Sequence, residues 1–194
     1  MNSKRKVNVS KERGVRTYVE MRRTSDWLLR KAQEEAAGSV FQLRASLLFT
    51  AFTLEAYLNH IGEKIFLCWA DLERLSPRQK LNVIAERLDV KVDYGRRPWQ
   101  IVKELFAFRN AVAHGKTENL TESEKNIPLE RYSDDDFHEL VPTEWEKYST
   151  QQNAVRARED VEKILKTMHA AAGFEDDFLF HSGFQFGSAT VVEE

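Results

Sequence analysis

Apolar side chains recur at helical spacing in five stretches of this 194-residue chain. The stretches are residues 15–37, 40–72, 76–88, 98–114 and 143–172. Apolar residues three and four positions apart lie on one face of a helix, so each stretch predicts a helix with a buried side. Stretch 40–72 is apolar on nearly every side, which is typical of a buried core helix. The pattern predicts an all-α, up-and-down bundle of about five helices.

Local signals mark several ends of these helices. Ser76 and Gln79 have the spacing of a capping box, and Thr143 and Glu146 repeat that spacing. Gly115 follows the fourth predicted helix and suits a left-handed position there. These residues predict where two helices begin and one ends.

The predicted helices form a single domain over residues 15–172. A basic segment at 1–14 is expected to be a flexible arm, and the acidic segment 117–142 a long loop before the last helix. A Phe-rich tail occupies residues 173–194. Polar residues interrupt the apolar run at 40–72, so no membrane span is expected.

Charge is distributed unevenly although the formal net charge is only −2. Residues 1–31 contain ten Lys and Arg against three Asp and Glu, whereas residues 118–146 contain two basic residues against ten acidic ones. Solvated faces are the preferred interpretation, and docking of the acidic loop on the basic end is the alternative. The arm is interpreted first as a solubilising tail and second as a contact for a phosphate backbone.

The single cysteine, Cys68, lies in an apolar run and is expected to be an inert core thiol. One cysteine permits no intramolecular disulfide, which suits a reducing, cytoplasmic location. No zinc cluster is expected from one cysteine, and the sequence contains no HExxH and no GxSxG motif. We therefore expect neither a metal nor a cofactor.

The tail contains five phenylalanines, which are too many to leave exposed. They are Phe174, Phe178, Phe180, Phe184 and Phe186. Alternation around Ser182-Gly183 suggests a hairpin, and the rings are expected to pack on the bundle or on a second subunit. Base stacking is the less favoured alternative, because no basic residues accompany the rings in the tail.

The fourth predicted helix ends in a group of polar residues that suits phosphodiester chemistry. Arg109, Asn110 and His114 supply an anion clamp, a positioning amide and a proton carrier. At about 100° per residue, Asn110 and His114 share a polar face with Lys103, whereas Arg109 lies beside the apolar stripe. A long arginine side chain can still reach round the helix toward the histidine.

Glu55 interrupts the most apolar stretch of the chain and needs a partner there, because burial of an unpaired carboxylate is costly. Arg109 is the predicted partner. The pair is interpreted either as a structural link between two helices or as a carboxylate that orients a catalytic arginine. Asn59, one turn beyond Glu55, is expected to extend this polar network.

The order Arg109-Asn110, three residues and then His114 resembles the RNxxxH form of the signature of the HEPN superfamily, whose members are small all-helical domains. The segment LFTAFTLEAYLNHIGEKIF at 48–66 looks like the second long helix of such domains. The resemblance covers most of residues 43–115. It implies a HEPN-like helical bundle.

Many members of that superfamily are metal-independent endoribonucleases, often toxins or antiviral effectors, and others are inactive binding or dimerisation modules. Some toxin subgroups carry a tyrosine two residues after the histidine, where this chain has Lys116. The resemblance also implies a homodimer, which would supply a second histidine because acid and base are both needed. An antitoxin or another protein partner is a further expectation.

The expected activity is cleavage of RNA by attack of its 2′-hydroxyl on the neighbouring phosphate. His114 would move the protons, Arg109 would hold the phosphate, and Asn110 would orient the phosphate or the histidine. We expect Lys103 and Lys116 to contact the RNA. The alternative is an inactive HEPN-like module that dimerises or binds a partner through the same surface.

Overall fold

The computed structural model describes residues 6–121, 128, 130, 133, 140–174 and 179–192. Most of the predicted acidic loop, residues 1–5 of the predicted arm, and Phe178 of the tail lie outside the described residues.

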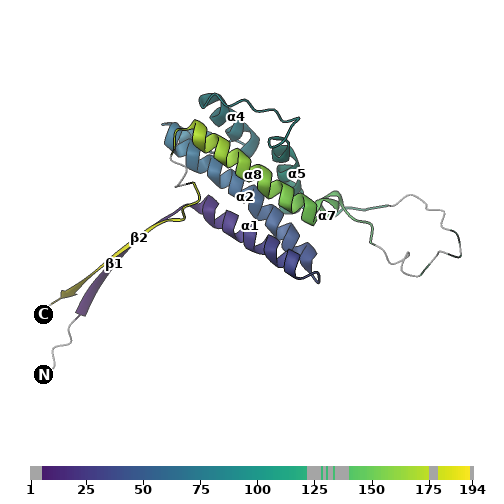
Figure 1. Ribbon diagram of the computed structural model, residues 1–194, viewed down its shortest axis with the longest axis horizontal. Helices are drawn as coiled ribbons and strands as arrows, with labels where there is room; N and C mark the ends of the chain where they lie inside the picture. Colours follow the sequence, from purple (N-terminus) through teal and green to yellow (C-terminus); the bar gives the residue numbers. More distant parts are fainter. Residues whose placement is uncertain are drawn as a thin grey trace, which may run out of the picture.

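Three long helices form the centre of the molecule (Figure 1). They are α1 (Thr17–Glu34), α2 (Ser39–Ile65) and α8 (Gln151–Ala171). Helix α2 packs against α1 and α8, and it also contacts α4 (Pro77–Arg87) and α5 (Gln100–Ala113). Its buried side chains lie within about half of its circumference. The helix was expected to be buried because it is apolar on nearly every side, but its other side carries the exposed Phe41 and Phe52.

Two shorter helices accompany these among the described residues. Helix α3 (Trp69–Leu72) follows α2, and α7 (Glu144–Tyr148) precedes α8 and packs on α5. Both predicted capping boxes are confirmed, at the start of α4 and at the start of α7. The predicted helices at 40–72 and 143–172 are each divided in two, at residues 66–68 and 149–150.

Hydroxyl groups link α1 to α2 inside the core. Ser25 Oγ lies 2.7 Å from Thr50 Oγ1, and Ser46 Oγ donates to the Ser25 carbonyl oxygen at 3.0 Å. All three side chains are at most 1% exposed, and each has a hydrogen-bond partner. Their burial therefore leaves no unmet polar group between the two helices.

A two-stranded antiparallel sheet joins the two ends of the described chain. Strand β1 (Lys6–Val15) pairs with β2 (Gly183–Val192) along the full length of both. The strands form a narrow ribbon that extends away from the helices (Figure 1). The largely helical fold is confirmed, but the all-α prediction did not include this ribbon.

The ribbon also changes the expectations for the two ends. The segment expected to be a flexible arm contains β1, and β2 pairs with β1 rather than with another part of the tail in a hairpin. Near its start, the tail packs on the bundle: Leu179 is 2% exposed, and Phe180 contacts the core. Further along, Phe184 and Phe186 are 47% and 66% exposed, so these two rings do not pack on the bundle. The other expectation, that they pack on a second subunit, stays a prediction.

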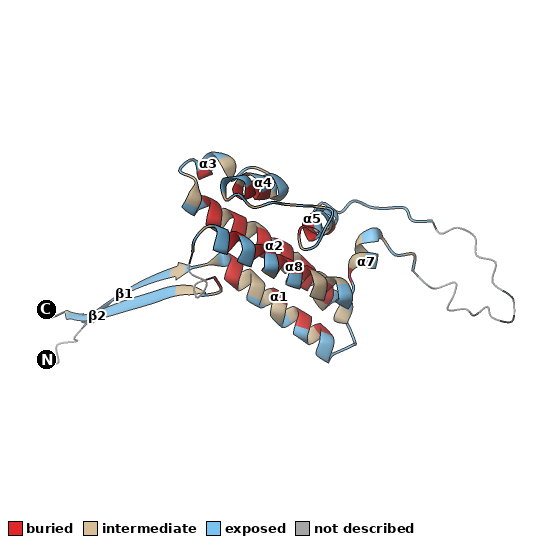
Figure 2. Ribbon diagram, turned by 45° about the horizontal axis from the view of Figure 1, so that its top comes forward, coloured by how far each residue is buried: buried red, intermediate tan, exposed pale blue. Residues whose placement is uncertain are grey.

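Burial is concentrated in the helices, and the ribbon is exposed on both faces (Figure 2). Cys68 is exposed in the turn between α2 and α3, so the prediction of a core thiol is wrong. The chain leaves the helix just before this residue, which removes it from the apolar face. Within the described part of the chain, no helix has both the length and the apolar character needed to cross a bilayer.

Candidate active site

Arg109 lies at the seam between α5 and α2. Its Nη2 donates to Glu55 Oε2 at 2.8 Å, and its guanidinium carbon lies 5.3 Å from the centroid of the Phe106 ring. The side chains of Arg109 and Glu55 are 18% and 29% exposed. The Arg109 Nε atom is buried and makes no hydrogen bond. The predicted ion pair is therefore confirmed, and one guanidinium N–H remains unused.

Asn110 and His114 lie on the exposed side of α5. Both side chains face solvent, and His114 is the residue that caps the helix, with φ −110° and ψ 23°. The backbone N–H of His114 donates to the Asn110 carbonyl oxygen at 2.9 Å. Gly115 does not adopt the left-handed conformation expected for it. The helix ends instead on the Asn110–His114 backbone hydrogen bond, which leaves the imidazole open to solvent.

Helix geometry separates the guanidinium from the other two groups. Around α5, Arg109 lies about 140° from His114 and about 100° from Asn110, whereas Asn110 and His114 are only about 40° apart. No hydrogen bond joins any two of these three side chains, all of which the structure describes. Arg109 therefore lies in the contact between α5 and α2, whereas Asn110 and His114 lie on the exposed face of α5.

Asn59 belongs to a different contact from the one expected. Its Oδ1 accepts a hydrogen bond from Lys80 Nζ at 2.7 Å, which joins α2 to α4. Lys80 is only 4% exposed, so its stem is buried while its ammonium group reaches the amide. The expected extension of the Glu55 network to Asn59 is not what the structure shows, because Lys80 from another helix supplies the partner.

The two lysines expected to contact RNA are both exposed. Lys103 lies about 20° from both Asn110 and His114 around α5, and about 16 Å from His114 along the axis. Lys116 follows the end of the helix. The open face of α5 thus carries an ammonium group, an amide and an imidazole in one row.

A groove of about 460 Å³ borders this open face. Ala107 and Ala111 of α5 form one wall, and Trp145 and Tyr148 of α7 contribute to the other. Burial raises the pKa of Tyr148 to about 12, so its phenol is neutral at pH 7. These aromatic residues were not among the predicted site residues, since no local sequence pattern indicated that the segment after the acidic loop would pack on α5.

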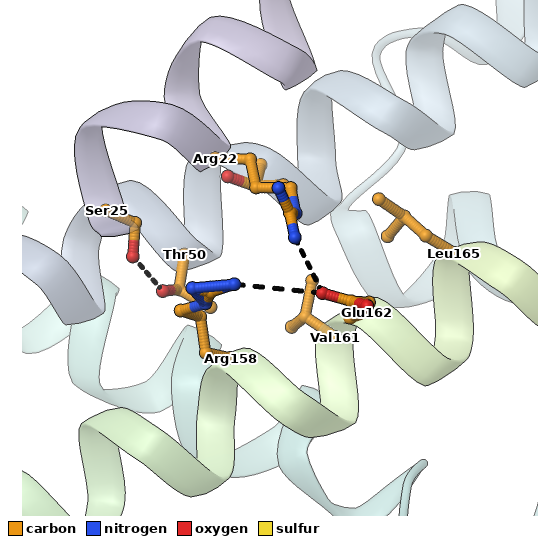
Figure 3. Close-up of a pocket in the computed structure, with 8 residues that line it drawn as sticks. Arg22, Ser25, Thr50, Arg158, Val161, Glu162 and Leu165 are labelled. Carbon is orange, nitrogen blue, oxygen red and sulfur yellow. Dashed lines mark hydrogen bonds and ion pairs between the residues drawn. The ribbon is translucent and has the colours of Figure 1, made fainter. Parts of the chain in front are cut away.

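A second polar cluster lies between α1, α2 and α8 (Figure 3). Arg22 and Arg158 both point at Glu162, with Nη2–Oε2 distances of 2.8 and 3.7 Å. Burial acts to raise the pKa of Glu162, but hydrogen bonds from Arg22 and Lys166 outweigh it and lower that pKa to about 2. The adjoining cavity is only about 10 Å³, roughly one water. The arginines and the glutamate neutralise one another's charge, and the cavity is too small for a ligand larger than water. This cluster is therefore a structural link between helices.

A third cluster of titratable groups lies where β1 meets the bundle. The rings of Tyr18 and His60 are 5.1 Å apart, and Tyr57 packs edge-on against Tyr18. Burial, followed by the charges of Lys64 and Arg16, lowers the pKa of His60 to about 4. His60 is therefore neutral at pH 7. Among the residues the structure describes, no three His, Cys, Asp or Glu side chains are grouped as metal ligands would be.

Comparisons of the chain with protein-family models, with curated proteins and with solved structures found no match.

Proposed function

We propose that this chain is a metal-independent endoribonuclease of HEPN type that cleaves RNA by 2′-hydroxyl attack. The observation that carries the proposal is the ion pair between Glu55 and Arg109, next to a helix end where the His114 imidazole is exposed. A partly buried carboxylate holds the arginine in a defined position. A solvent-exposed imidazole provides a proton donor and acceptor at the edge of the same helix.

In the proposed reaction, the 2′-oxygen bonds to phosphorus as the bond from phosphorus to the 5′-oxygen breaks. His114 takes the proton of the 2′-hydroxyl or supplies one to the departing 5′-oxygen. The products are a 2′,3′-cyclic phosphate and a free 5′-hydroxyl. Because both proton transfers are needed, a second His114 from another copy of the chain completes the pair.

Arg109 is proposed to stabilise the charge that grows on the phosphate oxygens. While Nη2 stays bound to Glu55, the phosphate is proposed to take the terminal guanidinium N–H groups that Glu55 leaves free, because the Nε–H is buried. Asn110, on the same face as His114, is proposed to orient the phosphate or the imidazole. Lys103 and Lys116 are proposed to contact neighbouring phosphates, since both are exposed beside this face.

A homodimer is part of the proposal, and an apolar stripe on α2 supports it. Phe41 and Phe52 are 67% and 38% exposed, and about 20° separates them around the helix. Glu55 lies about 60° from Phe52 on the same helix. An interface on this stripe would lie next to the ion pair of each copy.

Sedimentation tests this interface. The double variant Phe41→Asp/Phe52→Asp should sediment as a monomer, whereas Leu67→Asp, at another exposed apolar position, should not change the assembly.

The alternative function is an inactive helical module that dimerises or binds a protein partner. The engagement of Arg109 by Glu55 favours it, because a salt-bridged arginine has a structural role without any substrate. The exposed phenylalanines of α2 favour it equally. In this case His114 would be an exposed residue at a helix end, where the helix dipole favours a cation.

The deciding experiment is incubation of the purified chain with end-labelled RNA in EDTA, beside His114→Ala and Arg109→Ala. We expect cleavage products ending in a cyclic phosphate from the native chain, and a loss of about 100-fold or more in each variant. Lys163→Gln, an exposed change on α8, serves as the matched control. Cleavage that needs added metal, or that persists in both variants, would contradict the mechanism.

The proposed biological setting is that of a toxin or defence effector. Expression of an active ribonuclease slows growth of the host cell, so growth should recover with His114→Ala at an equal level of protein. A co-purified protein partner that suppresses RNA cleavage would identify an antitoxin. Equal growth of cells that express the native chain and the variant would argue against this setting.

A further inference from the structure

The sheet brings basic side chains near the start of the chain close to phenylalanines near its end. Strand β1 carries Lys11 and Arg13, and strand β2 carries Phe184 and Phe186. In the antiparallel register, Arg13 pairs with Gln185, the residue between the two phenylalanines. The tail alone lacks basic residues, but the ribbon does not.

The two phenylalanines form an exposed aromatic pair on one face of the ribbon. Their ring centroids are 5.2 Å apart with an interplanar angle of 34°, and both rings remain accessible to solvent. Phe184 lies over Gly14, where an added Cβ would come within 2.5 Å of the ring. Gly14 therefore allows the ring to lie flat against the neighbouring strand. The pair is held in position by the sheet and is not covered by the bundle.

The charge of the ribbon is positive and lies entirely on one strand. Strand β1 contains three basic residues and one acidic residue, Glu12, which gives a net charge of +2, and β2 contains no charged residue. Lys11 and Arg13 point to the face opposite the rings, because their registered partners alternate with the phenylalanines. In a ribbon only two strands wide, long side chains reach past the strand edge toward either face.

We propose that the β1–β2 ribbon binds single-stranded RNA, with bases stacked on Phe184 and Phe186 and the phosphate backbone along Lys11 and Arg13. Non-specific single-strand binding combines exposed aromatic rings with basic side chains. Here Lys11 and Arg13 would reach the RNA round the edge of β1, past Glu12, which is registered with Phe186 on the ring face. The proposal rests on the proposed function, since it assigns the ribbon to the RNA substrate. The ribbon would hold part of the single-stranded RNA away from the exposed face of α5 that carries His114.

Charge favours RNA over a second copy of this chain as the occupant. A polyanion is attracted by a net charge of +2, whereas two ribbons of that charge repel each other. The uncharged edge of β2 is the place where a second copy would pair if the ribbon served self-association. Self-association is therefore the competing outcome, and it has a separate readout in the sedimentation coefficient.

The test is fluorescence anisotropy of a labelled 20-nucleotide single-stranded RNA with the full His114→Ala chain in EDTA, which removes cleavage from the measurement. Adding Phe184→Leu/Phe186→Leu should weaken binding by about five-fold or more, because leucine is apolar but offers no ring to a base. Phe184→Tyr/Phe186→Tyr should bind within about two-fold of the parent. Leu140→Ala, at an exposed apolar position outside the ribbon, is the matched control.

A second pair of variants tests the backbone contact. Lys11→Gln/Arg13→Gln should reduce the slope of log affinity against log salt by about 1.4, since each phosphate contact with a single strand contributes about 0.7. Lys163→Gln on α8 should leave the slope unchanged. Far-ultraviolet circular dichroism and thermal unfolding of every variant confirm that the bundle is folded.

The results separate this proposal from the proposed function. Leucine variants that bind RNA as tightly as the parent would overturn the ribbon proposal, even if cleavage depends on His114. Variants that change only the sedimentation coefficient would assign the ribbon to self-association instead. RNA binding that requires the two rings, in a chain whose cleavage does not require His114, would support the ribbon proposal and reject the catalytic one.

Discussion

The bundle and the β1–β2 ribbon are stabilised by different kinds of contact. In the bundle, side chains of α2 such as Leu54 and Leu58 are completely buried. In the ribbon, backbone hydrogen bonds join the strands while nearly every side chain is exposed. Burial of apolar surface is the main favourable contribution to folding, so it is concentrated in the bundle. The ribbon should therefore depend on the bundle for its stability, whereas the bundle should tolerate damage to the ribbon.

The largest difference between the two regions should appear on truncation of an apolar side chain. Leu58→Ala leaves a cavity in the centre of the bundle and should lower the free energy of unfolding by about 2–5 kcal/mol. Val9→Ala in the ribbon, where the side chain is 62% exposed, should change it by less than about 0.5 kcal/mol. Urea unfolding followed by circular dichroism measures both. Similar losses for the two variants would refute the comparison.

A second contrast uses a glycine that packs against a buried ring. Gly62 of α2 faces the ring of Trp69, which is 4% exposed, and an added Cβ would collide with it. Gly62→Ala should lower the free energy of unfolding by about 1–2 kcal/mol, because overpacking costs about 1–3 kcal/mol and alanine recovers part through helix propensity. Thermal unfolding gives the value. An unchanged midpoint would mean that Trp69 moves aside freely.

The ion pair of the candidate site should contribute a smaller amount. Glu55→Gln removes the charge facing Arg109 and should lower the free energy of unfolding by about 1.5 kcal/mol, less than for a fully buried pair because both side chains are partly exposed. Glu63→Gln, an exposed change on the same helix, is the matched control and should have almost no effect. If both variants unfold alike, Glu55 does not hold Arg109 in place.

Acid should weaken the bundle through His60. In the folded chain the pKa of His60 is about 4, compared with an ordinary value of 6.5, because burial disfavours the charged imidazolium. The unfolded chain therefore binds a proton between pH 6.5 and 4 that the folded chain excludes, so stability is complete above pH 6.5 and falls as the pH falls. Allowing for partial exposure of the ring, we expect a loss of about 1 kcal/mol between pH 7 and pH 5.

The variant His60→Gln isolates this contribution. It should unfold with a shallower pH dependence than the native chain between pH 7 and pH 5, because glutamine does not titrate. Glu162, whose pKa is lowered to about 2, adds its own loss only as the pH falls below about 4.5. Parallel pH curves for the native chain and His60→Gln would show that the histidine is not shielded from protons.

Much of the bundle was predictable because its signals are local. The capping boxes at Ser76 and Thr143 are four-residue patterns, and the structure confirms both. The pair of Glu55 and Arg109 followed from one carboxylate in an apolar stretch and one arginine beside an apolar stripe. The capping boxes required only a spacing of three residues, and the ion pair required only helical periodicity and the cost of burying a charge.

The rest depends on contacts between distant segments. Pairing of β1 with β2 joins the two ends of the described chain, and no turn pattern links strands so far apart. The partner of Asn59 comes from another helix, as Lys80 shows. The helix predicted over residues 40–72 included Cys68, because the apolar pattern gives no sign that the chain leaves the helix just before this residue. In the candidate site, angles on α5 were predictable, but the groove with α7 was not.

The smallest expected effect tests the ribbon by the same kind of change as Gly62→Ala. Gly14→Ala also places a Cβ against an aromatic ring, but Phe184 is 47% exposed and free to turn into solvent. The free energy of unfolding should change by less than about 0.5 kcal/mol. Amide hydrogen exchange should quicken in β1 and β2 and stay the same in α2 and α8, because opening of the ribbon is local. A loss as large as that of Gly62→Ala would mean that the ribbon and the bundle unfold as one unit.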